Sequence, residues 1–288
     1  MLLDPSRLAL ANQGLEFVRQ ILARGQERVL ATCRSPERAT DLVALRRTYG
    51  VERLEVLRLD VQDDESIEQA GVFIEKNMNG QLDRLVNLTG VLHDESMRPE
   101  TRYQALNRQQ LMKSMEINAV GNILVAARMM PFLVEAGRRR TPERPAVLAN
   151  MSARVSSIGD NRLGGWYSYR SSKAALNQLT KTLSLELERK KQNVSAILLH
   201  PGTCVRRHSR RAVDGLAHLP FPDCPPTHVA RAPVLQDTSL SKPFQRNVPE
   251  HQLFSTERGV QQLLGIIDNC QIEQSGALIA WDGTRIEW

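Results

Sequence analysis

The sequence predicts an α/β fold: a doubly wound parallel sheet with helices on both faces, in one domain over residues 1–288. Short apolar segments alternate along the chain with longer amphipathic ones, which is the pattern of strand–helix–strand units. Neither an internal repeat nor a linker divides the chain. Its hydrophobic fraction of 41% over 288 residues suits a globular protein with a sizeable core.

The predicted strands are short and apolar. In chain order they are Arg7–Ala11, Arg28–Thr32, Leu54–Leu59, Arg84–Leu88, Ala146–Met151, Val194–Leu199 and Ala277–Trp281. The first is the weakest, and the last closes the sheet. The predicted helices carry apolar residues at the helical period. They are Leu15–Ala23, Glu37–Tyr49, Glu65–Asn77, Arg108–Ala136, the run from Tyr169 to Leu187, and Ser255–Ile267.

Composition argues against several classes of function. The longest apolar runs fall far short of the roughly 18 residues that a membrane helix needs, and the amino end lacks the apolar block of a secretory signal. The four cysteines are widely spaced, so we expect reduced thiols, a cytoplasmic protein and no metal site. The net charge of +6 is concentrated, because Val205–Gln236 carries five Arg against two Asp and so holds +3 of it. We therefore expect neither a nucleic-acid nor a membrane partner.

Tyr169 and Lys173 are the strongest candidates for chemistry. They are four residues apart at the start of a helical run, so their side chains lie on one face of the helix. A cation beside a phenol lowers the pKa of the phenol, which a tyrosine needs in order to act as a general acid or base near neutral pH. A surface tyrosine beside a solvated lysine has the same spacing, and the motif alone does not decide between the two.

The flanking residues favour the catalytic interpretation. Asn150-Met-Ser-Ala-Arg precedes a Gly-rich turn, Trp-Tyr-Ser-Tyr-Arg-Ser-Ser-Lys173 opens the helix, and His200-Pro-Gly follows the next strand. This order of motifs resembles the short-chain dehydrogenase/reductase family. The residues of the motifs resemble its C-factor-like carbonyl reductase branch, and the resemblance runs from about Gly14 to Trp288. The resemblance implies a Rossmann-like fold, an NADP(H) cofactor and hydride transfer to a small-molecule carbonyl substrate. Because members are commonly dimers or tetramers, it also implies a homo-oligomer.

Candidate cofactor contacts lie at strand ends, where ligands bind in such sheets. Arg34 follows the second predicted strand, where a cation can pair with the 2′-phosphate of NADP; a surface arginine in a turn is the alternative. Asp60 and Val61 follow the third strand, and the resemblance implies a contact with the adenine there. The alternative for Asp60 is a helix N-cap, a role for which Asp63 competes.

Three further candidates depend more heavily on the resemblance. Asn87 and Gly90 match the family's Asn-x-Ala-Gly after the fourth strand, where a small residue admits the cofactor, although an ordinary turn favours both residue types. Asn118 lies inside a long predicted helix, although asparagine is a poor helix former. The resemblance implies that Asn118 holds a water molecule linking Lys173 to solvent; an outward polar position is the alternative.

The resemblance also implies the catalytic roles. Tyr169 would protonate the nascent alkoxide, Lys173 would lower the pKa of Tyr169 and hold the ribose hydroxyls, and Asn118 would relay protons. The segment Pro243–Leu253 would be the substrate lid. The implied cofactor contacts are Gly14, Arg34, Asp60, Val61, Asn87, Gly90, Tyr169, Lys173, Pro201, Gly202 and Thr238.

The chain departs from the family pattern at two places near the expected site. Where the family has Gly-x-x-x-Gly-x-Gly, Leu8–Gly14 has a single glycine, so leucine and alanine side chains crowd the place of the pyrophosphate. Where the family has its hydrogen-bonding serine, this chain has Ala153, and either Ser152 or Ser156 could donate to the substrate oxygen instead. Losing such a donor typically costs about 100- to 1000-fold in rate.

A third departure interrupts the family pattern between Cys204 and Asp237. The segment Val205–Gln236 has five prolines and no apolar period, which predicts a poorly ordered insertion. One hypothesis is a retained intron, which sequencing of the transcript across this junction tests.

These departures motivate two rival hypotheses. One is a non-catalytic binding or scaffold protein on the same fold. The other is a defective gene product, because the first predicted strand would be central in the sheet. One measurement distinguishes the three hypotheses. NADPH binding with turnover indicates the enzyme, and binding without turnover indicates the scaffold. The absence of both binding and cooperative melting indicates the defective product.

Overall fold

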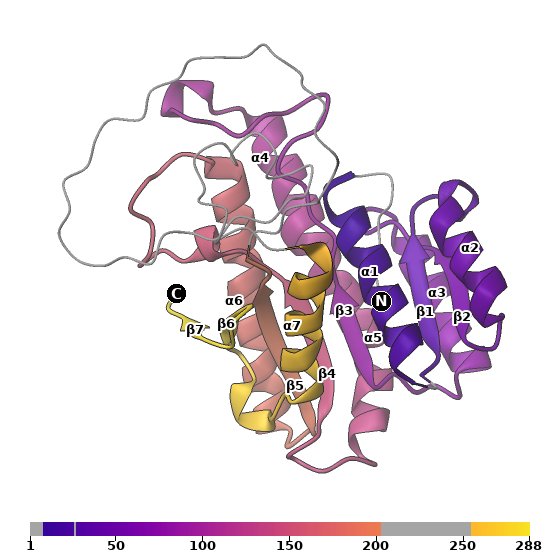
Figure 1. Cartoon of the computed structure of the whole chain (residues 1–288). Helices are drawn as coiled ribbons and strands as arrows, with labels where there is room; N and C mark the ends of the chain where they lie inside the picture. Colours follow the sequence, from indigo (N-terminus) through magenta and orange to yellow (C-terminus); the bar gives the residue numbers. More distant parts are fainter. Residues whose placement is uncertain (1–7, 26, 203–254) are drawn as a thin grey trace.

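The computed structural model describes residues 8–25, 27–202 and 255–288 (Figure 1). Its strands are β1 Val29–Cys33, β2 Leu54–Arg58, β3 Arg84–Asn87, β4 Ala146–Met151, β5 Val194–His200, β6 Leu278–Ala280 and β7 Arg285–Ile286. Its helices are α1 Leu8–Arg24, α2 Thr40–Tyr49, α3 Asp64–Asn77, α4 Arg108–Met115, α5 Gly121–Gly137, α6 Tyr167–Arg189 and α7 Thr256–Asp268. Every predicted strand after the first is present, each within a few residues of its expected bounds.

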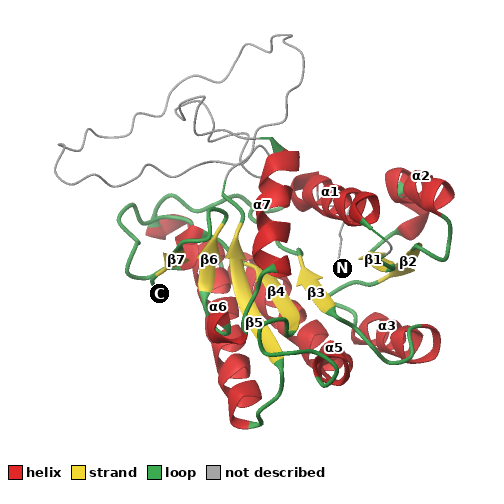
Figure 2. Cartoon of the chain, turned by 60° about the horizontal axis from the view of Figure 1, so that its bottom comes forward, coloured by secondary structure: helices red, strands yellow, loops and turns green. Residues whose placement is uncertain are grey.

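The strands pair in parallel, as the alternating pattern predicts. One sheet has the order β3-β4-β5-β6-β7 and the other pairs β1 with β2. Among the strands of the described residues, only the short strand β7 runs antiparallel to its neighbour. Helices cover both faces: Figure 2 shows α1 and α7 on one side and α3, α5 and α6 on the other. The fold is therefore a Rossmann-like, doubly wound α/β arrangement.

The first predicted strand is wrong. Residues Arg7–Ala11 are expected to be extended, but α1 begins at Leu8 and continues unbroken to Arg24. The physical reason is composition: alanine and leucine are among the best helix formers, and neither a β-branched residue nor a proline separates them from the amphipathic helix that follows. As a consequence, the described residues contain no strand pairing between β1 and β3, and the sheet is divided there.

The two faces of the sheet have separate apolar cores. On one face α1 and α7 pack through Phe17, Val18 and Leu264 against strand residues such as Val86. On the other face α3 and α5 pack against the opposite side of the same strands. Both cores include residues of β1 as well as β4, so side-chain packing joins the two parts of the sheet. Hydrophobic burial of this kind is the main stabilising contribution.

The long predicted helix at Arg108–Ala136 is confirmed but interrupted. A π-helical turn, Glu116–Val120, lies between α4 and α5 and contains Asn118. Such turns are rare and are frequent at functional sites. The helical stretch from Arg108 to Gly137 is long and apolar enough to cross a membrane, but 56% of that window is buried within the fold, as in the core helix of a globular protein.

Candidate functional site

The carboxyl ends of β1 and β2 lie together, and so do those of β3, β4 and β5, because the strands within each group are parallel. Arg34 follows β1, Asp60 and Val61 follow β2, and Asn87 ends β3. Pro201 and Gly202 follow β5. The helix α6 begins after β4, so Tyr169 in its first turn follows the carboxyl end of that strand. These candidates therefore follow the carboxyl ends of their strands, which is the position at which ligands bind in doubly wound sheets.

Tyr169 and Lys173 are both buried, with 9% and 2% of their surfaces exposed. The Lys173 ammonium donates a hydrogen bond of 2.8 Å to the carbonyl oxygen of Met151, the last residue of β4. Within the described residues, no hydrogen bond holds the Tyr169 hydroxyl, although the ring of Trp166 packs edge-on against the Tyr169 ring at 6.4 Å. The phenol is fixed by packing, and its hydroxyl is available to a ligand.

Burial controls the acid–base properties of this pair. It lowers the pKa of Lys173 to about 7 and raises the pKa of Tyr169 above its ordinary value. The sequence led us to expect a lowered pKa for Tyr169, and in this structure the pKa is raised instead, because burial disfavours the charged phenolate. At neutral pH the phenol therefore carries its proton, which is the form that a general acid needs.

Asn118 is fully buried and points inward, which excludes the outward polar position. Its side-chain oxygen accepts from the Val91 N–H at 2.6 Å, and its side-chain nitrogen donates to the Val91 carbonyl at 2.8 Å. The same nitrogen donates to the Ser172 hydroxyl at 2.9 Å. The amide thus ties the segment after β3 to α6, one residue before Lys173.

Asn122, which the sequence did not single out, continues this tether. Its side-chain nitrogen donates to the carbonyls of Ile117, Asn118 and Thr89 at 2.9, 3.2 and 3.2 Å. The first two carbonyls belong to the π-helical turn. Asn118 and Asn122 together hold the residues on either side of Gly90. The signal available in the sequence was the second asparagine, four residues after the first in an apolar helix.

Asn87 belongs to a buried chain of amides at the ends of β3 and β4. Its side-chain nitrogen donates to the Asn150 side-chain oxygen at 2.8 Å and to the Asn122 carbonyl at 3.2 Å. Asn150 in turn donates to the Thr180 hydroxyl at 2.9 Å. The side-chain oxygen of Asn87 is buried without a hydrogen-bond partner in the described part of the chain. An unsatisfied buried acceptor of this kind needs a donor from a water molecule or a ligand.

Neither serine substitutes freely for the residue missing at Ala153. Ser152 donates to the Asn177 side-chain oxygen at 2.6 Å, and Ser156 donates to the Ala153 carbonyl at 2.5 Å. Asn177 also donates to the Ser156 hydroxyl at 2.7 Å. Both hydroxyl protons are therefore engaged within the protein. Sequence spacing could not reveal this, because the partner, Asn177, lies on α6.

The expected adenosine side of the site has two distinct acids. Asp63 caps α3 by accepting from the Ser66 N–H at 3.2 Å, so the N-cap alternative for Asp60 is wrong. In the described residues the side chain of Asp60 makes one hydrogen bond: its carboxylate accepts from the Gln62 N–H at 3.1 Å. Val61 is buried against α5, where a side chain at Gly121 would come within 2.5 Å of the Val61 carbonyl. Arg34 is half-buried directly after β1.

The other end of the site follows β5. His200 is the last residue of this strand, and burial, reinforced by the nearby Arg154, lowers its pKa to about 4, so it is neutral at pH 7. Gly202 has a φ of 68°, a backbone conformation that favours glycine. Thr238, the insertion at 205–236 and the lid at Pro243–Leu253 lie outside the described residues.

Gly14 is the candidate that the structure contradicts. It was expected in a phosphate-binding turn, but it is buried inside α1, in the second turn of the helix. A helix interior presents no free N–H groups to a phosphate. The two ends of an NADP site therefore fit the residues present: the unpaired Asn87 oxygen, the half-buried Arg34 and the Lys173 amine. The glycine turn that would hold the pyrophosphate does not form at Gly14.

Comparison with known proteins gives a consistent result. The family model for short chain dehydrogenases matches residues 11–214. The short-chain dehydrogenase anuI of Penicillium roqueforti is 30% identical over 205 residues, which cover 67% of this chain and 76% of that protein. The C-signal of Myxococcus xanthus is 27% identical, covering 73% of this chain and 94% of that protein. The NADPH-bound carbonyl reductase from chicken fatty liver superposes with a TM-score of 0.75 at 23% identity, covering 100% and 98% of the two chains. These matches confirm the expected family, and the chain belongs to the short chain dehydrogenases, a family of oxidoreductases.

Proposed function

We propose that this protein reduces an aldehyde or ketone to an alcohol with NADPH, in the cytoplasm. The observation that carries the proposal is the Tyr169–Lys173 pair: a buried phenol without a hydrogen-bond partner in the described residues, one helical turn from a buried amine at the carboxyl edge of the sheet. NADPH would supply the hydride. Cys33 and Cys270 are buried and form no disulfide within the described residues, which suits a reducing compartment. Fractionation of cells tests that location.

In this mechanism the side chains of the chain itself manage the proton. Tyr169, whose pKa is raised by burial, is protonated at neutral pH and gives its proton to the substrate oxygen as charge develops there. Burial lowers the pKa of Lys173 to about 7, which is close to neutral pH, so the amine can exchange a proton readily there. Asn118 fixes α6 one residue before Lys173 by its hydrogen bond to Ser172. In this proposal Tyr169 donates the proton, Lys173 exchanges protons near it, and Asn118 keeps both on a fixed helix.

The test combines binding and turnover. Purified protein is mixed with NADPH, and nicotinamide fluorescence and thermal melting are followed before a reactive aldehyde is added. The proposal predicts binding, a raised melting temperature, and oxidation of NADPH only after the aldehyde is present. Binding without oxidation, across a panel of aldehydes and ketones, would contradict catalysis.

A second experiment tests cofactor choice. Arg34→Ala should weaken NADPH binding by about tenfold and leave NADH binding nearly unchanged, because only NADPH carries the 2′-phosphate that a guanidinium holds. The matched control is Arg38→Ala, on an exposed arginine whose side chain is 83% accessible. Equal losses for both cofactors would show that Arg34 has no role in phosphate recognition.

The second candidate function is a non-catalytic binding protein on the same fold. Two observations favour it: Gly14 lies inside α1, and the hydroxyls of Ser152 and Ser156 are engaged within the protein. This candidate predicts a melting temperature that is insensitive to carbonyl compounds, and a protein that binds NADPH without consuming it.

We also propose that the protein forms a homo-oligomer. Met112, Val120 and Leu124 follow one another at helical spacing along α4, the π-helical turn and α5, with 63%, 45% and 43% of their surfaces exposed. An exposed apolar stripe of this kind is typical of an interface. Light scattering on the purified protein tests the proposal, and Val120→Lys should shift the mass towards that of a monomer.

A further inference from the structure

The catalytic helix begins without a cap of its own. Its N-cap residue, Trp166, has a φ of 53° and a ψ of 43°, which is left-handed, and makes no side-chain capping bond. The preceding Gly164 and Gly165 are also left-handed. Such a conformation is unfavourable for a bulky residue and persists only where its surroundings enforce it.

Glu100, on the loop between β3 and α4, provides those surroundings. Its backbone carbonyl accepts from the Trp166 N–H at 2.5 Å, and its carboxylate accepts from the Ser168 N–H at 3.2 Å and from the Ser168 hydroxyl. The contact is close: a side chain at Gly165 would come within 3.3 Å of the Glu100 carbonyl. Glu100 therefore caps α6 from outside the helix.

The burial of Glu100 is unusual for a carboxylate. Only 3% of its surface is exposed, and no lysine or arginine among the described residues forms an ion pair with it. Burying an unpaired charge is costly, but a helix N-terminus carries partial positive charge and unsatisfied N–H groups that stabilise an anion. The favourable field of α6 explains why a carboxylate is retained there.

The residues that Glu100 holds are adjacent to Tyr169. Ser168 precedes it in the chain, and the Trp166 ring packs edge-on against the Tyr169 ring with centroids 6.4 Å apart. Tyr169 is the third residue of α6, so its direction depends on the geometry of this first turn. We propose that Glu100 is a positioning residue, which aims the Tyr169 hydroxyl by fixing Trp166 and Ser168. The inference rests on the proposed reductase function.

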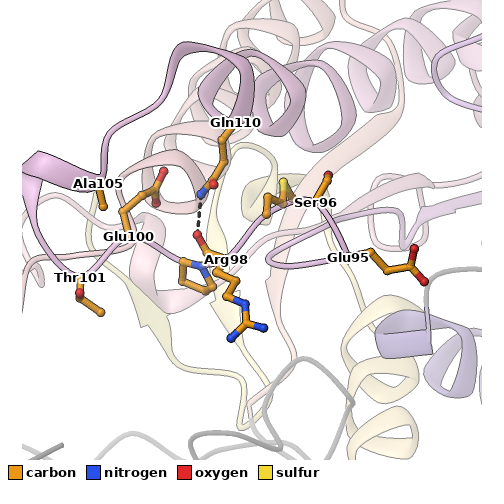
Figure 3. Close-up of a pocket in the computed structure, with 9 residues that line it drawn as sticks. Glu95, Ser96, Arg98, Glu100, Thr101, Ala105 and Gln110 are labelled. Carbon is orange, nitrogen blue, oxygen red and sulfur yellow. Dashed lines mark hydrogen bonds between the residues drawn. The ribbon is translucent and has the colours of Figure 1, made fainter.

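Figure 3 shows the pocket of about 380 Å³ whose wall includes Glu100. Glu95 is labelled at the opposite end of the same pocket and is exposed. Since neither a hydrogen bond nor an ion pair links Glu95 to α6 in the described residues, Glu95→Gln is a matched control for Glu100→Gln. Both substitutions remove one negative charge from the same loop and keep the side-chain shape.

The experiment compares the full-length variants by steady-state kinetics, NADPH binding and amide hydrogen exchange. Glu100→Gln removes one of the two acceptor oxygens and the negative charge at the start of α6, which loosens the hold on Ser168. The value of kcat should therefore fall by about 10- to 100-fold, as for a small misplacement of a reacting group. The dissociation constant for NADPH should stay within about twofold, since Glu100 does not contact the expected cofactor residues. Exchange of peptides covering residues 164–172 should accelerate, and Glu95→Gln should change none of these.

Ser168→Ala provides a second, milder variant if Glu100→Gln does not fold. It removes the hydroxyl partner only, so it should lower kcat less, and the two substitutions combined should cost less than the product of the separate effects. An unchanged kcat in Glu100→Gln or, if that variant does not fold, in Ser168→Ala overturns the inference. If the unsubstituted protein has no turnover, the proposed function fails, and exchange alone decides: unchanged exchange overturns the anchoring role, and acceleration confined to residues 164–172 supports it.

Discussion

The hydroxyl of Tyr169 is the residue-level feature on which the proposed reaction depends. The residue is buried, and within the described residues its hydroxyl makes no hydrogen bond, so the fold gains little from the hydroxyl. Its presence therefore requires an explanation outside the stability of the folded chain.

Tyr169→Phe separates catalysis from folding. Turnover should fall by at least about 100-fold, because the general acid is lost. The melting temperature should stay equal or rise slightly, since phenylalanine fills the same space without an unpaired hydroxyl. NADPH binding, followed by nicotinamide fluorescence, should change by less than about twofold. Residual activity near that of the unsubstituted protein would remove Tyr169 from the mechanism.

Lys173 makes stability depend on pH. Burial lowers its pKa from 10.5 to about 7, so between these pH values the unfolded chain binds a proton that the folded chain does not. Stability should therefore rise with pH through this window. Below it, the amine is charged in both states, and the penalty of burying the charge is at its full value.

Lys173→Met tests this dependence. Relative to the unsubstituted protein, the variant should have its greatest advantage near pH 7, and that advantage should shrink by on the order of 2–3 kcal/mol by about pH 9.5. Urea unfolding at both pH values measures the difference, and groups common to both proteins cancel. Tyr169 contributes an opposite slope only above its unfolded pKa of 10.0, outside the range used. Parallel stability curves would show that Lys173 is charged in the folded protein.

At the scale of single elements, the π-helical turn between α4 and α5 depends on one buried amide. Asn122 donates to two carbonyls of this region, those of Ile117 and Asn118, and to the Thr89 carbonyl before Gly90. A π-helical turn leaves carbonyls out of the regular ladder, and here a side chain satisfies them.

Asn122→Ala should destabilise the protein by about 2–3 kcal/mol, because buried carbonyls lose their donor. Asn77→Ala is the control: this asparagine ends α3, is exposed, and donates to the Phe73 carbonyl. Its cost should be below about 1 kcal/mol. Equal losses in urea unfolding for both variants would contradict a special role for the buried amide.

The elements that the sequence predicts well are those with a strong local signal. The apolar period between Tyr169 and Leu187 anticipates α6, and the run Ala146–Met151 is β4 at the same bounds. The failure at Leu8 has a local cause as well: the short apolar run Arg7–Ala11 was predicted to be a strand, while its alanine and leucine residues are helix formers. Local propensity was the better guide there.

The parts of the site that the sequence could not predict are contacts between distant segments. Nothing near Glu100 or Asn122 in the chain reveals that one caps α6 and the other binds the residue before Gly90. The direction in which the Tyr169 pKa shifts was missed for the same reason, because the shift depends on burial by elements far away in the sequence. Spacing along one helix gives which side chains share a face, but not how much solvent reaches them.

At the scale of the whole molecule, the strands of the described residues form two groups. In the described residues β1 pairs only with β2, and β3 only with β4. The two parts are joined by helices and side chains: α1 packs on both β1 and α7, and α3 packs on α5. A two-stranded sheet is marginal by itself, so the β1–β2 part depends on this packing.

Hydrogen exchange should therefore report two levels of protection. Amides of Val29–Cys33 and Leu54–Arg58 should exchange through a partial opening of lower free energy, while those of Ala146–Met151 and Val194–His200 should require global unfolding.

The expected cofactor contacts lie in both parts, with Arg34 after β1 and Lys173 beside β4. NADPH should thus slow exchange in the β1–β2 part more than elsewhere, since a ligand that bridges two parts is lost when they separate. Mass spectrometry with and without NADPH measures both effects. Uniform protection across all four strands would mean that the two parts open as one unit, and NADPH-induced slowing confined to β4 and β5 would mean that the cofactor does not reach Arg34.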